Sequence, residues 1–149
     1  FNMVGPYLAG ARVLDAYAGT GALGIEALSR GAARVDFVEK IPSVARIIRE
    51  NLQDVGDDLE YEVFTGSVSD FTQGVASVGK YDLILADPPY DQFQPAEIAK
   101  LAPLLQPDGA LALSFPFQEG APELPGLDLQ TARKYASAGI AIYRKHDEK

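Results

Sequence analysis

Short strand-like runs, most of them apolar, alternate with segments of helical periodicity along most of the chain. The runs that predict strands lie at residues 11–18, 33–39, 60–66, 80–90 and 109–117. One helix is predicted to follow a glycine-rich turn and to reach residue 30. Further helices are predicted at residues 42–55, 69–77 and 95–105. Strands that alternate with helices are typical of a doubly wound, mostly parallel sheet with helices on both faces.

The C-terminal end of the sequence has a different pattern. Residues 127–135 ("LDLQTARKY") and 139–145 ("GIAIYRK") predict two antiparallel strands joined by a short turn at residues 136–138. The predicted fold is therefore α/β and Rossmann-like, with a seven-stranded, mostly parallel sheet and an antiparallel C-terminal pair. We expect one domain over residues 1–149. Because the sequence begins at Phe1 rather than at Met, we also expect a segment upstream of it.

The composition argues against several classes of protein. The sequence has no cysteine, which excludes a disulfide scaffold and a thiolate zinc site and is typical of a cytoplasmic protein. Its apolar runs are far shorter than the ~20 residues of a membrane helix, so we expect no membrane partner. We also expect no metal. The formal net charge of -8 by itself argues against a nucleic-acid partner, because phosphate contacts need basic side chains.

Residues 19–24, "GTGALG", match the G-x-G-x-x-G pattern of a loop that opens a nucleotide-binding helix. The pattern suits NAD and S-adenosylmethionine alike, because a glycine turn lets the backbone approach either ligand. Glu39 lies where a carboxylate binds ribose hydroxyls, which both cofactors carry. Asp15, at the end of the first predicted strand, would repel a pyrophosphate but suits an ammonium and a sulfonium group. These residues therefore favour S-adenosylmethionine.

The strand at residues 80–90 ends in the motif "ADPPY". Two prolines remove two backbone donors, so no strand ladder continues beyond Asp87. The Asp87 carboxylate and the Pro88 carbonyl can then accept both N–H groups of an exocyclic amine and tilt its lone pair toward an electrophilic methyl group. Tyr90 offers a flat face for a base, which must be extruded or single-stranded to reach it. The alternative interpretation is that the motif is only a rigid turn.

A polar segment, "FTGSVSDF", follows the third predicted strand at residues 64–71. The Ser67 or Asp70 side chain, or the backbone N–H of Val68, could bind the adenine edge of the cofactor. A helix N-cap is an equal alternative for Ser67.

The stretches "VLDAYAGTGALGIEALSRGA", "VDFVE" and "YDLILADPPY" together resemble the RsmD-type methyltransferases. The resemblance implies an S-adenosylmethionine-dependent methyltransferase fold and methylation of guanine N2 in small-subunit (16S) ribosomal RNA, free or within an assembled particle. The cofactor-binding residues that it implies are Asp15, Ala18, Gly19, Thr20, Gly21, Glu39, Lys40, Ser67, Val68 and Asp87. The catalytic residues that it implies are Asp87, Pro88 and Tyr90. The resemblance also implies an upstream basic segment, of which we expect only "FN" to be present in this sequence.

Three other functions remain open at this point. An adenine-amino DNA methyltransferase shares the D-P-P-Y motif, but the sequence offers no separate target-recognition domain. An NAD-dependent oxidoreductase would keep the glycine turn and Glu39, yet it needs a proton donor that is not evident. A cofactor-binding module without catalytic activity would keep the same loop.

Overall fold

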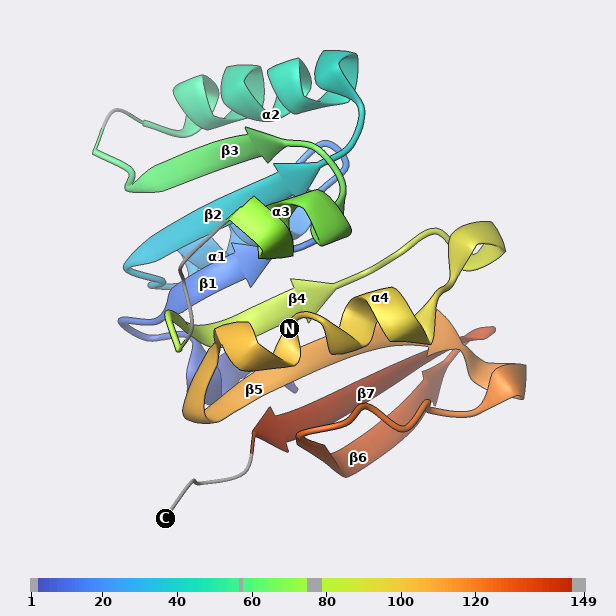
Figure 1. Ribbon diagram of the computed structural model, residues 1–149. Coiled ribbons are helices and arrows are strands. Elements are labelled where there is room, and N and C mark those ends of the chain that lie inside the picture. Colours follow the sequence, from blue (N-terminus) through green and yellow to red (C-terminus); the bar gives the residue numbers. More distant parts are fainter. Residues whose placement is uncertain (1–2, 57, 75–78, 146–149) are drawn as a thin grey trace.

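The computed structural model describes residues 3–56, 58–74 and 79–145, which contain a seven-stranded sheet covered by helices (Figure 1). The strands are β1 Arg12–Asp15, β2 Arg34–Glu39, β3 Tyr61–Thr65, β4 Tyr81–Ala86, β5 Leu105–Pro116, β6 Leu127–Tyr135 and β7 Ala138–Lys145. The α-helices are α1 Ala22–Ser29, α2 Pro42–Val55, α3 Val68–Gly74 and α4 Pro95–Ala99. Short 3₁₀ turns are η1 Gly5–Tyr7, η2 Tyr90–Gln92, η3 Ala102–Leu104 and η4 Phe117–Glu119.

The sheet has the order β3-β2-β1-β4-β5-β7-β6. Strands β1 to β5 are parallel, whereas β7 is antiparallel to both β5 and β6, so the predicted C-terminal pair is confirmed. The strand order reverses between β1 and β4, and ligands bind at the carboxyl ends of parallel strands beside such a switch point. Asp15, Glu39 and Asp87 end or follow β1, β2 and β4, and all lie at this edge.

Successive side chains of the strands point into two apolar layers, one on each face of the sheet. In β1, Val13 packs in the layer that includes residues of α1 and α2, and Leu14 packs in the layer that includes residues of α3 and α4. Both side chains are fully buried, which stabilises the fold by roughly 1.5–3 kcal/mol each. Figure 1 shows α3 and α4 in front of the sheet and α1 behind it, which confirms the doubly wound arrangement.

Several predicted boundaries differ from the structure. The helix predicted at residues 95–105 is wrong beyond Ala99, where α4 ends. Pro103 lacks a backbone N–H, and its ring would collide with the carbonyl of Ala99 in a continuous helix. The chain forms η3 instead and enters β5 earlier than the predicted residue 109. The last part of the helix predicted at residues 69–77 lies outside the described residues.

A buried carboxylate ties two strands together near their amino ends, away from the switch point. Asp36 accepts hydrogen bonds from Tyr81 Oη at 2.7 Å and from Arg34 Nε at 2.9 Å, and Lys80 Nζ lies 3.2 Å away. Burial and the bond to Asp36 raise the pKa of Tyr81. These contacts satisfy the carboxylate of a residue that is only 4% exposed. Within the described ranges, every helix falls short of the length and apolar character that a membrane span requires.

Candidate functional site

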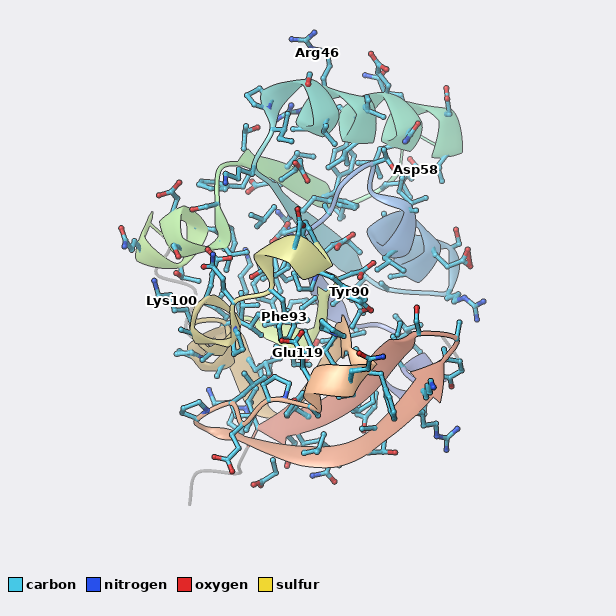
Figure 2. The ribbon with its side chains drawn as sticks, turned by 90° about the vertical axis from the view of Figure 1, so that its right-hand side faces the viewer. Arg46, Asp58, Tyr90, Phe93, Lys100 and Glu119 are labelled. Carbon is cyan, nitrogen blue, oxygen red and sulfur yellow. The ribbon has the colours of Figure 1, made fainter. Side chains whose placement is uncertain are left out.

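A cavity of about 740 Å³ opens at the carboxyl edge of the parallel strands, on the side that faces the viewer in Figure 2. Its volume is within the ordinary range for a small-molecule site. The predicted site residues that line it are Ala18, Gly19, Thr20, Glu39, Lys40, Ser67, Val68, Asp87, Pro88 and Tyr90. Asp15 and Gly21 are not among the lining residues. Residues that are far apart in the sequence therefore meet where the topology predicts a ligand.

The glycine-rich turn forms one wall of the cavity. Gly19 and Gly21 have φ angles of 57° and 88°, in the left-handed region that favours glycine. The Ala18 N–H donates to the Val38 carbonyl at 2.9 Å, which ties the turn to β2. A Cβ at Gly21 would lie 3.1 Å from the Ile48 side chain, so the turn packs tightly beneath α2. Gly21 thus supports the cavity wall without lining it.

The Glu39 carboxylate is held in one orientation at the cavity wall. Its Oε1 accepts a hydrogen bond from the Gly19 N–H at 2.8 Å, and its Oε2 accepts one from the Ile41 N–H at 2.9 Å. A carboxylate has about four acceptor positions, so two further donors can bind to it. A pair of neighbouring ribose hydroxyls is the kind of ligand that this geometry fits.

Asp15 lies beneath the turn and is fully buried. Its Oδ2 accepts a hydrogen bond from the Gly24 N–H at 3.0 Å, and within the described part of the chain its Oδ1 has no partner. Burial raises the pKa of Asp15 to about 7; the bond from Gly24 acts in the opposite direction, and the carboxylates of Asp87 and Glu39 raise it further. The direct cofactor contact predicted for Asp15 stays a prediction.

This arrangement bears on the choice between the two cofactors. Gly24 is the third residue of α1, so its N–H is one of the donors that a phosphate would use at a helix N-terminus. Asp15 already occupies that donor and places a carboxyl group behind the turn. An orphaned buried carboxyl oxygen fits a cationic ligand such as S-adenosylmethionine better than a pyrophosphate.

The D-P-P-Y segment forms the opposite wall of the cavity. Strand β4 ends at Ala86, and Asp87 is exposed at the cavity edge. The Tyr90 hydroxyl and Ser114 Oγ are hydrogen-bonded at 2.9 Å, and the Tyr90 side chain is 40% exposed. Figure 2 shows Tyr90 near the middle of this face. Ser114 therefore restrains Tyr90 at the mouth of the site, a contact that sequence reasoning missed.

A second, mostly apolar cavity of about 350 Å³ lies on the other side of Asp87. Leu23 and Asp87 line both cavities. Ser114 and Tyr135 line the second cavity but not the first. The Asp87 carboxylate is thus at the junction of a large cavity and a smaller one.

Ser67 caps helix α3. Its Oγ accepts a hydrogen bond from the Asp70 N–H at 3.0 Å, and Asp70 Oδ2 accepts one from the Ser67 N–H at 3.3 Å. This reciprocal pair is a capping box, so the N-cap alternative is confirmed. Ser67 and Val68 still line the cavity, and their contact with an adenine stays a prediction.

A polar network that sequence reasoning missed joins α3 and α4 to the residues before the glycine-rich turn. The Tyr17 hydroxyl donates to Glu97 Oε1 at 2.8 Å, and the Ser69 hydroxyl donates to Glu97 Oε2 at 3.1 Å. Burial and the bond to Glu97 raise the pKa of Tyr17. Glu97 follows Tyr17 by 80 residues, so no local pattern could have paired them.

Charge at the cavity is mainly negative, since Glu39, Asp87 and Glu97 line it together with Lys40. Among the described residues, no group of three or more His, Cys, Asp or Glu side chains could hold a metal ion. The acidic lining can therefore hold an organic cation, and Asp87 can present its carboxylate to a second ligand.

Comparisons with known proteins extend this description. A family model described as Conserved hypothetical protein 95 matches residues 1–144. YlbH of Bacillus subtilis, a candidate rRNA methyltransferase by name, is 33% identical over 97% of this chain and 82% of its own length. Ribosomal RNA small subunit methyltransferase D of Haemophilus influenzae is 39% identical over 60% of this chain, a match that spans about half (47%) of that protein.

A solved structure of a candidate methylase from Haemophilus influenzae has a TM-score of 0.84 at 28% identity, over 99% of this chain and 94% of that chain. This match confirms the predicted methyltransferase fold and favours it over the oxidoreductase alternative. Since the family model covers nearly the whole sequence, the chain belongs to the Conserved hypothetical protein 95 family, which is the RsmD family of methyltransferases.

Proposed function

We propose that this chain methylates the exocyclic N2 of a guanine in small-subunit ribosomal RNA, with S-adenosylmethionine as the methyl donor. The observation that carries the proposal is the place of Asp87 at the junction of the two cavities, beside Pro88 and Tyr90. The larger cavity would hold the cofactor and the smaller one the target base. The names of the two relatives support ribosomal RNA as the substrate class.

The chain's own residues would bind the cofactor at its ribose and at its methionine end. The two free acceptor positions of Glu39 would bind the ribose hydroxyls, because Gly19 and Ile41 already fix its carboxylate. The acidic lining and the buried Asp15 carboxyl favour the cationic methionine end. When bound, the cofactor supplies an electrophilic methyl group on sulfur.

Asp87 and Pro88 would act on the target amine. The Asp87 carboxylate and the Pro88 carbonyl accept its two N–H groups and orient the nitrogen lone pair toward the methyl group. As the nitrogen–methyl bond formed and the sulfur–methyl bond broke, with its electron pair left on sulfur, the nitrogen would become acidic and Asp87 would accept its proton. Orientation supplies much of the rate, so no strongly basic group is needed.

Tyr90 would hold the base by stacking, and its bond to Ser114 limits the rotation of the ring. Tyr90 itself lines the larger cavity, and its partner Ser114 lines the smaller one. The smaller cavity is mostly apolar, which suits the flat faces of an extruded base.

The negative charge of the chain bears on the form of the substrate. A net charge of -8 disfavours tight binding to naked RNA. We therefore propose an assembled small-subunit particle in the cytoplasm as the substrate, because protein contacts there can replace phosphate contacts.

The test compares methyl transfer from labelled S-adenosylmethionine to free small-subunit ribosomal RNA and to small-subunit particles, followed by nucleoside analysis of the product. Asp87→Asn should lower the transfer rate about a hundredfold or more while binding of S-adenosylhomocysteine persists. Asp54→Asn, an exposed change on α2, should leave the rate unchanged. Methylated adenine in the product, or an Asp87→Asn variant as active as the parent, would contradict the proposal.

A further inference from the structure

One carboxylate at the larger cavity has no role in the proposed reaction. Of the described carboxylates that line this cavity, Glu39 is assigned to the ribose and Asp87 to the target amine, which leaves Glu97. Glu97 lies in the first turn of α4 and is half-buried. A charged group that has lost part of its hydration at a binding cavity is stabilised by donors from a ligand. Its neighbours indicate which ligand group that is.

Two hydroxyl groups hold the Glu97 carboxylate in one orientation. Oε1 accepts the Tyr17 hydroxyl at 2.8 Å, and Oε2 accepts the Ser69 hydroxyl at 3.1 Å. Lys100 Nζ donates to Ser69 Oγ at 3.1 Å, so the hydroxyl hydrogen of Ser69 is directed toward Glu97. Because a carboxylate has about four acceptor positions, each oxygen keeps one position that no described residue occupies. Glu97 can therefore accept hydrogen bonds from a ligand without losing its supports.

Glu97 is bound to the part of the cavity where the base of the cofactor would lie. Strand β2, which ends in Glu39, lies between β3 and β4 in the sheet. A cofactor bound through its ribose to Glu39 must direct its methyl group toward Asp87, after β4, so its base is directed toward α3, after β3. Val68, the first residue of α3, lines the cavity there. Ser69 follows Val68 and donates to Glu97, which places the carboxylate beside this end.

The chemistry of a carboxylate suits one group of an adenine. The exocyclic amine of adenine donates two N–H groups, whereas hypoxanthine has a carbonyl oxygen there and would set two acceptors against each other. The side chains that the sequence offered for this edge are Ser67 and Asp70. They are bonded to each other's backbone in the capping box, and Asp70 is not among the residues that line the cavity. Glu97 is therefore the side-chain acceptor best placed for the amine.

We propose that Glu97 accepts a hydrogen bond from the exocyclic amine of the cofactor's adenine and so selects adenine over a base with a carbonyl oxygen at that position. Tyr17 and Ser69 are positioning residues, because they act by holding the carboxylate in place. This inference rests on the proposed function, since it takes S-adenosylmethionine as the methyl donor. It adds a residue of α4, remote in sequence from the glycine-rich turn, to the residues that bind the cofactor.

The experiment compares, by calorimetry, binding of S-adenosylhomocysteine and of S-inosylhomocysteine, in which a carbonyl oxygen replaces the amine. The parent should bind the adenine ligand about tenfold to a hundredfold more tightly. Glu97→Gln should lower this preference to below about threefold, because an amide can donate to the oxygen as well as accept from the amine. Tyr17→Phe should give an intermediate preference. The matched control is Glu123→Gln, a change at an exposed carboxylate that lines neither cavity, and it should keep the preference of the parent.

The ratio of the two dissociation constants separates a specific contact from general damage, because a distorted cavity would weaken both ligands alike. The same preference in the parent and in Glu97→Gln, or a parent that binds both ligands equally, would overturn the inference and leave the proposed function intact. An unchanged preference in Tyr17→Phe would overturn its positioning role. The expected preferences in a parent that methylates no RNA would support the inference and contradict the proposed function. A parent that binds neither ligand would overturn both.

Discussion

Replacing Asp15 by asparagine should change how stability depends on pH. Burial is the main cause that raises the pKa of Asp15 from 3.8 to about 7, so the folded protein binds a proton that the unfolded chain releases at lower pH. For a carboxyl group whose pKa is raised by folding, this contribution is fully present at low pH and is lost as the pH rises through 7. Asparagine has no such proton at any of these pH values.

The magnitude follows from the two pKa values of Asp15. Near pH 5 the bound proton stabilises the folded parent by about 2.5 kcal/mol relative to the ionised form, and near pH 8 by almost nothing. The free energy of unfolding of the parent minus that of Asp15→Asn should therefore fall by about 2.5 kcal/mol between these two conditions. Other titrating groups contribute equally to the free energy of unfolding of both proteins, so their contributions cancel in this difference.

Urea unfolding of both proteins at the two pH values, followed by circular dichroism, measures this difference. Asp58→Asn, a change at an exposed carboxylate, is the matched control and should behave as the parent does. A difference between parent and Asp15→Asn that is the same at both pH values would refute the reasoning, because Asp15 would then titrate as an ordinary carboxyl group. Binding of S-adenosylmethionine should also strengthen with rising pH in the parent and not in the variant, since only the ionised carboxylate attracts the cation.

Three further changes test the packing and the polar contacts. Gly24→Ala should destabilise the protein by about 1–3 kcal/mol in thermal unfolding, because the added Cβ would collide with the Phe37 ring where α1 packs on β2. Glu39→Gln should weaken binding of S-adenosylhomocysteine about tenfold to a hundredfold in calorimetry, because charged hydrogen bonds are lost. Tyr81→Phe should lower the free energy of unfolding by about 1–3 kcal/mol, because Asp36 loses a buried donor, while cofactor binding persists.

Each of these changes has a control of the same chemistry. Gly5→Ala adds a methyl group with no atom within 4 Å and should leave stability nearly unchanged. Glu50→Gln, exposed on α2, should leave cofactor affinity unchanged. Tyr61→Phe removes a hydroxyl from a half-buried ring outside the Asp36 contacts and should have a small effect. A control that matches its test variant would show that the named contact is not responsible.

Much of the site could be predicted from the sequence because its parts lie at strand ends. The glycine turn, Glu39 and the D-P-P-Y motif each follow a recognisable strand, and parallel strands bring their carboxyl ends to one edge. The prediction that these residues share one cavity is confirmed. The antiparallel C-terminal pair was likewise predicted from two strand-like segments separated by a short turn.

Other features were decided only by the tertiary structure. The sequence by itself determined the order of strands and turns, and therefore which backbone segments reach the cavity. It did not show that Asp15 would be buried against Gly24, that Glu97 would bind Tyr17, or that Ser114 would bind Tyr90. The physical reason is that local patterns set which face of a helix or strand is apolar, whereas these contacts depend on helix packing and strand register between segments far apart in the chain.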